Sequence, residues 1–156
     1  MARFPYTDFQ IEEIVQTRKH PRDWEPVRFE KVAKSKDSRR ADIQLVRQDG
    51  RTDQIRLVVH GRIERPQSYR AALLLQDIRI RGVDYHEISR SRFYKEVTPK
   101  GWHQDIINPN VDLADRQNYH RREPLENFNP TELNDFLSRV AGLWNIVLPD
   151  ENEFLL

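Results

Sequence analysis

The chain has 156 residues, of which 37% are hydrophobic and 33% charged, and its formal net charge is +1. This length suits one hydrophobic core, so we expect residues 1–156 to form a single domain. The absence of cysteine excludes disulfides, thiolate nucleophiles and cysteine-ligated zinc. Of the 26 basic residues 20 are arginines, whose planar guanidinium groups suit phosphates and carboxylates equally.

No window of the sequence approaches the roughly 20 consecutive apolar residues that a membrane-spanning helix needs. The first residues also lack the apolar stretch of a secretion signal. A chain without cysteine fits a reducing compartment. We therefore expect a cytoplasmic protein with no membrane partner.

The N-terminal region predicts one helix followed by a strand. Thr7 and Gln10 have the spacing of a capping box, and apolar residues at helical spacing follow, up to a boundary at Pro21. Alternation over 27–32 then predicts a strand. The charged segment 34–40 interrupts the alternation and is predicted to be a loop or a strand end.

The next region predicts an antiparallel hairpin. Alternating apolar residues over 43–46 and 55–59 flank Asp49-Gly50, a pair that favours a tight turn. In the second of these strands, polar and basic side chains share the face opposite the apolar ones. That face carries Arg56, Val58, His60 and Arg62.

Two further strands are predicted after a turn at 65–68. The segment 71–75 is apolar on both faces and therefore suits the centre of a sheet. Another strand is expected over 78–83, with or without a tight turn at Gln76-Asp77. The stretch 89–126 is poorly periodic and is predicted to be rich in loops.

The last predicted element is a second helix. Asn129 is its expected cap, Pro130 its first residue and Glu132 the partner in a capping box. Apolar residues then repeat at helical spacing, at Leu133, Phe136, Leu137, Val140, Leu143 and Trp144. Residues 145–149 are predicted to be the helix exit or a brief edge strand.

These elements predict an α+β fold. We expect an antiparallel sheet of about five strands, covered on one face by the N- and C-terminal helices. Titratable side chains concentrate in residues 80–103, and we expect the functional region over residues 84–122 or on the uncovered face of the sheet. Five scattered glycines exclude a phosphate-binding loop, and no glycine-flanked serine supports acyl transfer.

A metal site would combine Asp84 and His86, which face the same side of an extended strand, with His103 and His120. These residue types suit zinc or manganese. Their spacing matches no specific metal motif, and separately placed histidines are more often solvated or hydrogen-bonded. We therefore assign no metal and no cofactor from the sequence.

A metal-independent ribonuclease needs a base, an acid and a cation near the scissile phosphate. His86, His103, Lys95 and Arg81 are the candidate catalytic residues. The candidate residues for nucleic-acid binding are Arg56, Arg62, Arg70, Arg79 and Trp102. The alternatives stay open that the arginines only keep the sheet face soluble and that Trp102 packs in the core.

The C-terminal half, over about residues 70–148, resembles small uncharacterised prokaryotic domains, some of which are found near toxin–antitoxin or phage-defence genes. The resemblance is carried by Gly82-Val83-Asp84, Tyr94-Lys95-Glu96, Lys100-Gly101-Trp102-His103 and a capped helix that closes in Trp144-Asn145-Ile146. A histidine-rich loop typical of the toxin-type relatives is not reproduced. The resemblance implies an RNA-directed toxin or defence component.

Two functions remain open from the sequence. The first is a small protein that binds RNA or DNA, or cleaves RNA. The second is a non-enzymatic module, such as an inhibitor or adaptor, that binds a protein partner through Trp102, Tyr119 and the arginines. The sequence leaves open whether the protein is an enzyme.

Overall fold

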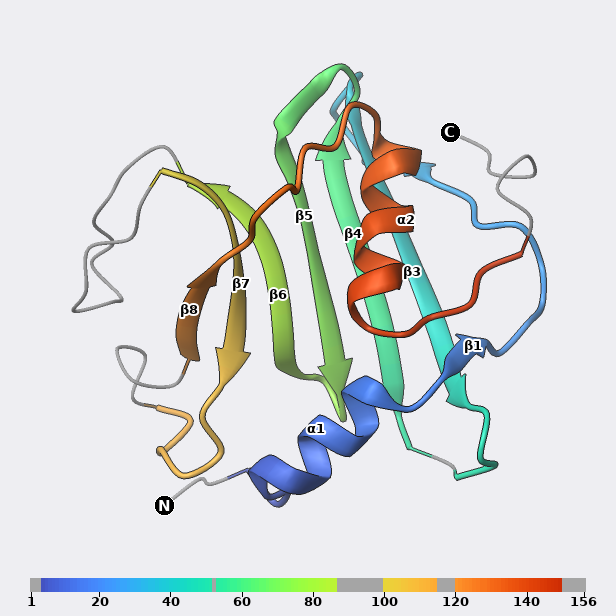
Figure 1. The fold of residues 1–156 in the computed structure, drawn as a ribbon. Helices are drawn as coiled ribbons and strands as arrows, with labels where there is room; N and C mark the ends of the chain where they lie inside the picture. Colours follow the sequence, from blue (N-terminus) through green and yellow to red (C-terminus); the bar gives the residue numbers. More distant parts are fainter. Residues whose placement is uncertain (1–3, 52, 87–99, 115–119, 150–156) are drawn as a thin grey trace.

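The computed structural model describes residues 4–51, 53–86, 100–114 and 120–149. Within these residues the chain forms an antiparallel sheet of eight strands in the order β1-β3-β4-β5-β6-β7-β8, with β2 paired to β3 on the same edge as β1 (Figure 1). The strands are β1 (Lys19–Pro21), β2 (Glu30–Lys31), β3 (Ser38–Arg47), β4 (Ile55–Arg62), β5 (Arg65–Leu75), β6 (Ile78–His86), β7 (Gly101–Ile107) and β8 (His120–Pro124).

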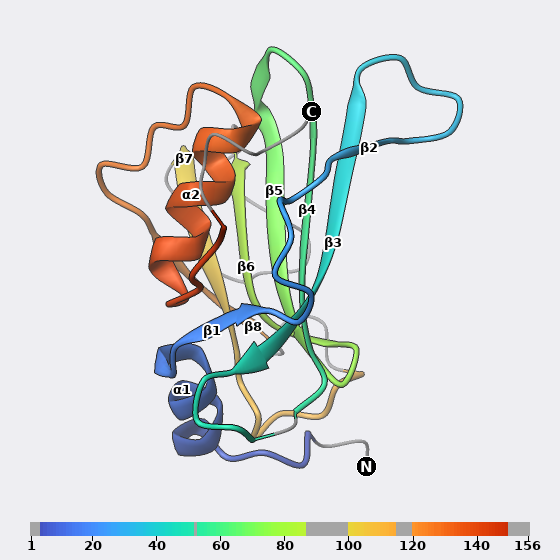
Figure 2. The same ribbon diagram turned by 90° about the vertical axis from the view of Figure 1, so that its right-hand side faces the viewer.

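Two helices, α1 (Asp8–Gln16) and α2 (Leu133–Leu143), lie on the same side of this sheet (Figures 1 and 2). Glu12 of α1 pairs with Arg81 of β6 at 2.7 Å. Just after α2, the indole of Trp144 donates a hydrogen bond to Gln104 of β7 at 2.8 Å. The predicted α+β class with an antiparallel sheet is confirmed, but the sheet is larger than the five strands expected.

The central strands follow the apolar alternation of the sequence. Ile55, Leu57 and Val59 of β4 are at most 1% exposed and belong to the core between sheet and helices. Arg56, Val58 and His60, which alternate with them, are half-buried on the opposite face, as predicted. Gln76 and Asp77 both have positive φ, 50° and 63°, and form the tight turn between β5 and β6.

The turn predicted at residues 65–68 is wrong, because these residues already belong to β5. The chain reverses one step earlier, where Glu64 has a φ of 63°. The Ser68 hydroxyl accepts a hydrogen bond from the Arg62 N–H at 2.8 Å and donates one to the Arg65 carbonyl at 2.6 Å. Pro66 and Ser68 are of residue types that favour turns, but here they lie in the irregular first part of β5.

The loop-rich character predicted for 89–126 is wrong for the parts that form β7 and β8. β7 buries His103 and Asp105 on the face opposite the helices and turns Gln104 toward the helices, so neither of its faces shows the apolar pattern by which a strand is recognised. The short edge strand β1 was not predicted, whereas β2 lies within the strand predicted over 27–32. Ser38 to Arg40 are the start of β3, so the strand-end alternative for this charged segment is confirmed. Strands β1, β7 and β8 account for the larger sheet.

The capping box of α1 is confirmed, since Thr7 and Gln10 bond each other reciprocally at 3.2 and 2.9 Å. The predicted start of α2 is wrong. The helix begins at Leu133, and its N-cap Glu132 makes no side-chain capping bond. Instead, the Asp135 carboxylate in the first turn accepts a hydrogen bond from the Thr131 N–H at 3.0 Å. Asn129 and Pro130 therefore lie in the segment before the helix and not at its cap and first turn.

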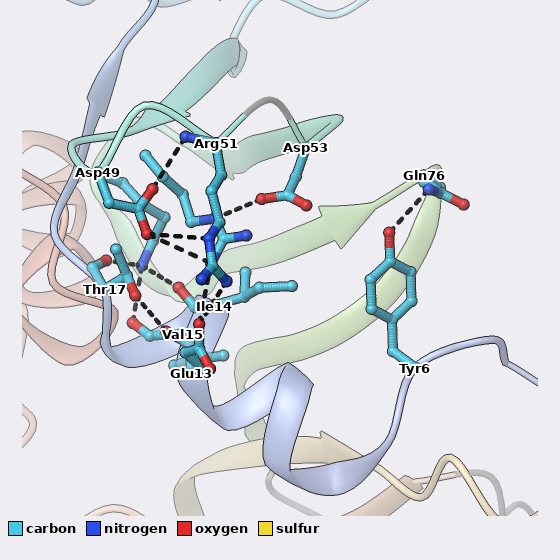
Figure 3. Close-up of polar contacts among 11 residues, drawn as sticks. Tyr6, Glu13, Ile14, Val15, Thr17, Asp49, Arg51, Asp53 and Gln76 are labelled. Atoms are coloured by element: carbon cyan, nitrogen blue, oxygen red, sulfur yellow. Dashed lines mark hydrogen bonds and ion pairs between the residues drawn. The ribbon is translucent and has the colours of Figure 1, made fainter.

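The C-terminal end of α1 is closed by a buried lysine. Lys19 is 0% exposed, and its Nζ donates to the carbonyl oxygens of Ile14, Val15 and Thr17 at 2.8, 2.7 and 2.7 Å. Figure 3 shows these carbonyl groups beside the loop between β3 and β4, where Arg51 pairs with Glu13 at 2.7 Å. The backbone of Lys19 also pairs with Ile146 in a single parallel bridge, so the segment after α2 is a helix exit with one bridge and not a strand of the sheet.

Candidate functional site

Three predicted polar residues meet where β6 pairs with β7. Asp84 lies directly opposite His103 in the antiparallel ladder, and His86 follows Asp84 by two positions. Residues opposite each other in a ladder, and residues two apart on a strand, point to the same face. Because Trp102 and Gln104 face the helices, Asp84, His86 and His103 lie on the face opposite α1 and α2.

The three side chains are in close contact. His103 Nε2 lies 2.5 Å from Asp84 Oδ1, and His86 Nε2 lies 3.6 Å from Asp84 Oδ2. The two imidazole centroids are 4.3 Å apart. His103 is 1% exposed, whereas the side chains of Asp84 and His86 retain 33% and 24% of their exposure. Solvent therefore reaches the cluster at Asp84 and His86, whereas His103 is buried behind them.

The buried atoms of this cluster are only partly satisfied. Nδ1 of His103 is buried without a hydrogen-bond partner among the described residues, whereas Nε2 and Asp84 Oδ1 contact each other. Burial by itself raises the pKa of Asp84, but contact with His103 and the charges of His86 and Arg122 outweigh it and lower the pKa. Burial lowers the pKa of His86, against the opposing effect of Asp84. These shifts favour a carboxylate beside a neutral imidazole.

A second carboxylate, that of Asp105, lies beside the cluster on the same face of the sheet. Asp105 is 2% exposed, and its Oδ1 lies 3.7 Å from His103 Nε2. Its two oxygens contact the guanidinium groups of Arg79 and Arg122, each at 3.2 Å. The pairing satisfies Asp105, because a carboxylate accepts several charge-assisted hydrogen bonds.

A row of basic residues crosses the same face. Arg40 of β3, His60 of β4 and Arg70 of β5 are opposite one another in successive ladders. Ala71 pairs with Val83, so Arg70 lies one position beyond that pair, as Asp84 does on β6. The register thus aligns the basic row with the Asp84, His86 and His103 cluster.

The structure separates Arg81, another predicted catalytic residue, from this cluster. Arg81 is buried on the helix side, where it pairs with Glu12. Lys95 lies outside the described residues. His120, which was weighed as a fourth metal ligand, has its Nε2 2.9 Å from the Arg79 carbonyl oxygen. Of the three predicted catalytic residues that the structure describes, His86 and His103 meet.

The predicted nucleic-acid-binding residues fall into three groups: a tryptophan that packs against the core, arginines that pair with carboxylates, and arginines that make no ion pair among the described residues. Trp102 faces the helices and packs against Phe128 and Phe136, with ring centroids 5.2 and 5.5 Å away. Arg56 contacts Asp42 and Asp77, and Arg79 contacts Asp105. Within the described ranges Arg62 and Arg70 make no ion pair, so their charges remain uncompensated by direct contact.

Sequence reasoning placed His60 on the basic face of the sheet but did not assign Arg40, Asp105 or Arg122 to the site. One usable pattern was present: Asp84-Tyr85-His86 and His103-Gln104-Asp105 each place a histidine and a carboxylate two positions apart. In paired strands, two such segments bring four polar side chains to one face. The irregular composition of the second segment concealed its strand.

Comparisons with known proteins identify no relative. No family model matches the chain, and no curated protein or solved structure is significantly similar to it. The resemblance to toxin–antitoxin or phage-defence domains therefore remains a prediction. In the described part of the chain, neither helix is long and apolar enough to cross a membrane.

Proposed function

We propose that the protein binds the sugar–phosphate backbone of nucleic acid with the sheet face opposite its helices. The observation that carries the proposal is the row of Arg40, His60 and Arg70, which are aligned across three neighbouring strands. Neighbouring strands are about 4.8 Å apart, so such a row presents regularly spaced donors to an extended anion. Guanidinium groups suit phosphate oxygens because they donate paired hydrogen bonds.

The charges at this end of the sheet support the proposal. Arg62, Arg65 and Arg70 are exposed, and none of them makes an ion pair within the described residues. Elsewhere on the chain, arginines such as Arg47 and Arg81 are engaged by carboxylates. Uncompensated positive charge at one end of a face is the expected footprint of a site that binds phosphates.

His60 lies in the positive field of the surrounding arginines. Its pKa is lowered by burial first, and then by the positive charges of Arg70, Arg40 and Arg62. One of these cations shares its strand, and the other two come from the strands on either side. The same field attracts polyanions, and salt screens the attraction.

The arrangement favours contacts with the backbone over contacts with bases. Stacking of bases requires exposed aromatic faces, but Trp102 packs in the core and contacts Tyr85 edge-on at 5.5 Å. Tyr94 lies outside the described residues. Binding that rests on phosphate contacts alone is independent of sequence.

RNA cleavage is the second candidate, favoured by the position of His86 and Asp84 on the face that carries Arg70. A general acid or base must reach the reacting oxygen within hydrogen-bond distance. His86 meets this condition through its partial exposure, whereas the 1% exposure of His103 suits a supporting role. His86 is thus the residue whose replacement tests cleavage.

The test is binding of the purified full chain to a labelled 20-nucleotide RNA and to DNA of the same sequence across a salt series. We expect affinity to fall linearly on a logarithmic salt scale. Arg70→Ala should weaken binding to both and reduce the salt slope by about one. Arg121→Ala is the matched control, because Arg121 is exposed on the helix side and pairs with Glu123 at 2.9 Å.

Failure to bind either polymer at low salt, or equal losses in Arg70→Ala and Arg121→Ala, would refute the proposal. The protein-interaction alternative would then take its place. The same samples are analysed for cleavage. Loss of cleavage in His86→Ala, with binding retained, would establish the nuclease, whereas binding without cleavage would leave a nucleic-acid-binding module.

A further inference from the structure

We propose that Asp84, His86 and His103 form a binding site for a divalent transition-metal ion, with zinc as the representative ion. Two imidazoles and one carboxylate form a ligand set that zinc accepts, and three protein ligands leave a coordination position open. The inference does not depend on nucleic-acid binding. It concerns a different chemical property of the same sheet face.

Geometry is the first argument. One ligand atom from each of the three residues can be chosen so that all three lie within 4.8 Å of one another. Zinc–ligand bonds of about 2.0–2.2 Å place neighbouring ligand atoms roughly 3.3–3.5 Å apart in a tetrahedron. The contacts of Asp84 with His103, at 2.5 Å, and with His86, at 3.6 Å, bracket that separation. Small side-chain rotations therefore suffice to form the site.

The state of the buried atoms is the second, independent argument. His103 is 1% exposed, and its Nδ1 has no hydrogen-bond partner among the described residues. Its Nε2 contacts only the Asp84 carboxylate closely, with Oδ1 2.5 Å away. Buried polar atoms are rarely left without a partner, because they lose solvation without compensation. A cation between Nε2 and Oδ1 would satisfy both atoms at once.

The surroundings fit a ligand site as well. All three residues are held by the ladder between β6 and β7, and ligands on paired strands are positioned more firmly than ligands on loops. Asp105 lies 3.7 Å from His103 Nε2 and is itself held by Arg79 and Arg122. A carboxylate held at this position adds negative charge beside the proposed cation site.

His120 is not part of the proposed site, because its Nε2 contacts the Arg79 carbonyl oxygen. The open coordination position therefore faces the side on which Asp84 and His86 are partly exposed. Such a position accepts water or an oxygen of a ligand.

The experiment is calorimetric titration of the metal-stripped full chain with Zn²⁺, followed by Co²⁺ substitution and visible absorption. We expect one ion per chain, and d–d bands typical of a nitrogen- and oxygen-ligated site. His86→Ala and Asp84→Asn should each lower the affinity at least 100-fold. Both changes are at partly exposed side chains, and circular dichroism checks that the variants remain folded.

Histidines outside the cluster provide the matched control. His20→Ala and His60→Ala remove imidazoles from other strands and should leave the zinc affinity within a factor of two. Absence of one-to-one binding at 100 µM Zn²⁺ would overturn the proposal and identify Asp84 and His103 as a hydrogen-bonded pair. Equal losses in His60→Ala and His86→Ala would also overturn it, since zinc would then be binding to scattered surface histidines.

Discussion

Replacing Lys19 with methionine should destabilise the fold through the end of α1. The three carbonyl oxygens that accept from Lys19 Nζ belong to Ile14, Val15 and Thr17, at distances of 2.7–2.8 Å. The last carbonyls of a helix have no partner within the helix, and they carry the negative end of its dipole. Methionine retains most of the length and apolar character of the side chain but removes all three donors.

Two opposing effects determine the size of the loss. Each buried carbonyl left without a partner costs about 1–3 kcal/mol, so three of them cost at least about 3 kcal/mol. Against this, methionine removes a buried charge: burial, and then the charge of Arg47, lower the pKa of Lys19 to about 7. Three acceptors match the three donors of the ammonium form, which supports the charged state. We expect a net loss of about 3 kcal/mol, a large part of the roughly 5–15 kcal/mol typical of a domain.

The assay is urea unfolding at pH 7, with extrapolation to zero denaturant. Lys31→Met is the matched control, because Lys31 is exposed on β2 and its replacement should change the free energy of unfolding by less than about 0.5 kcal/mol. The denaturant slope should stay the same in both variants. A loss of under about 0.5 kcal/mol in Lys19→Met would refute the reasoning, since the contacts with the helix end would then contribute nothing net.

Three further stability predictions follow from buried groups elsewhere. Burial lowers the pKa of His120 from 6.5 to about 4, so the unfolded chain takes up the proton first as the pH falls. The free energy of unfolding should therefore fall by about 3 kcal/mol from pH 6.5 to 4. In urea unfolding across this range, His120→Gln should lack this pH-dependent loss. Asp105→Asn should lower the free energy of unfolding by about 3 kcal/mol, because two arginines lose a buried partner. Asp42→Asn, at an exposed residue, should lower it by under about 1 kcal/mol. Equal losses of unfolding free energy in urea would contradict this prediction. Gly61→Ala should destabilise the fold by about 2 kcal/mol, because its Cβ would lie 2.5 Å from the ring of buried Tyr69. Gly142→Ala in α2 should instead stabilise the fold by about 0.5–1 kcal/mol. Thermal unfolding should show midpoint shifts of opposite sign for the two variants.

Local patterns predicted the elements whose inward positions are apolar. The capping box at Thr7, the alternation of β4 and the periodicity of α2 each depend on residues close together in the chain. Such patterns are readable because burial of an apolar face requires a fixed period. β7 was missed for the same reason, since polar residues interrupt both of its faces, with Gln104 on the helix side and His103 and Asp105 buried on the opposite face.

The candidate site was only partly predictable. His86 and His103 could be chosen by residue type, but no local pattern shows that Asp84 lies opposite His103. Arg81 illustrates the difficulty from the other side. It was grouped with the histidines by proximity in sequence, and the structure places it on the helix side with Glu12.

The sequence by itself determined the class of the fold and the polar face of β4, because amphipathic periods are local properties. Only the tertiary structure decided which polar side chains meet. A bulge in β6 pairs Leu73 with Arg81 but Leu74 with Arg79, although strict alternation would put both arginines on one face. Arg79 therefore reaches Asp105 while Arg81 faces α1. Register and bulges depend on the partner strand, so a single strand's sequence does not contain them.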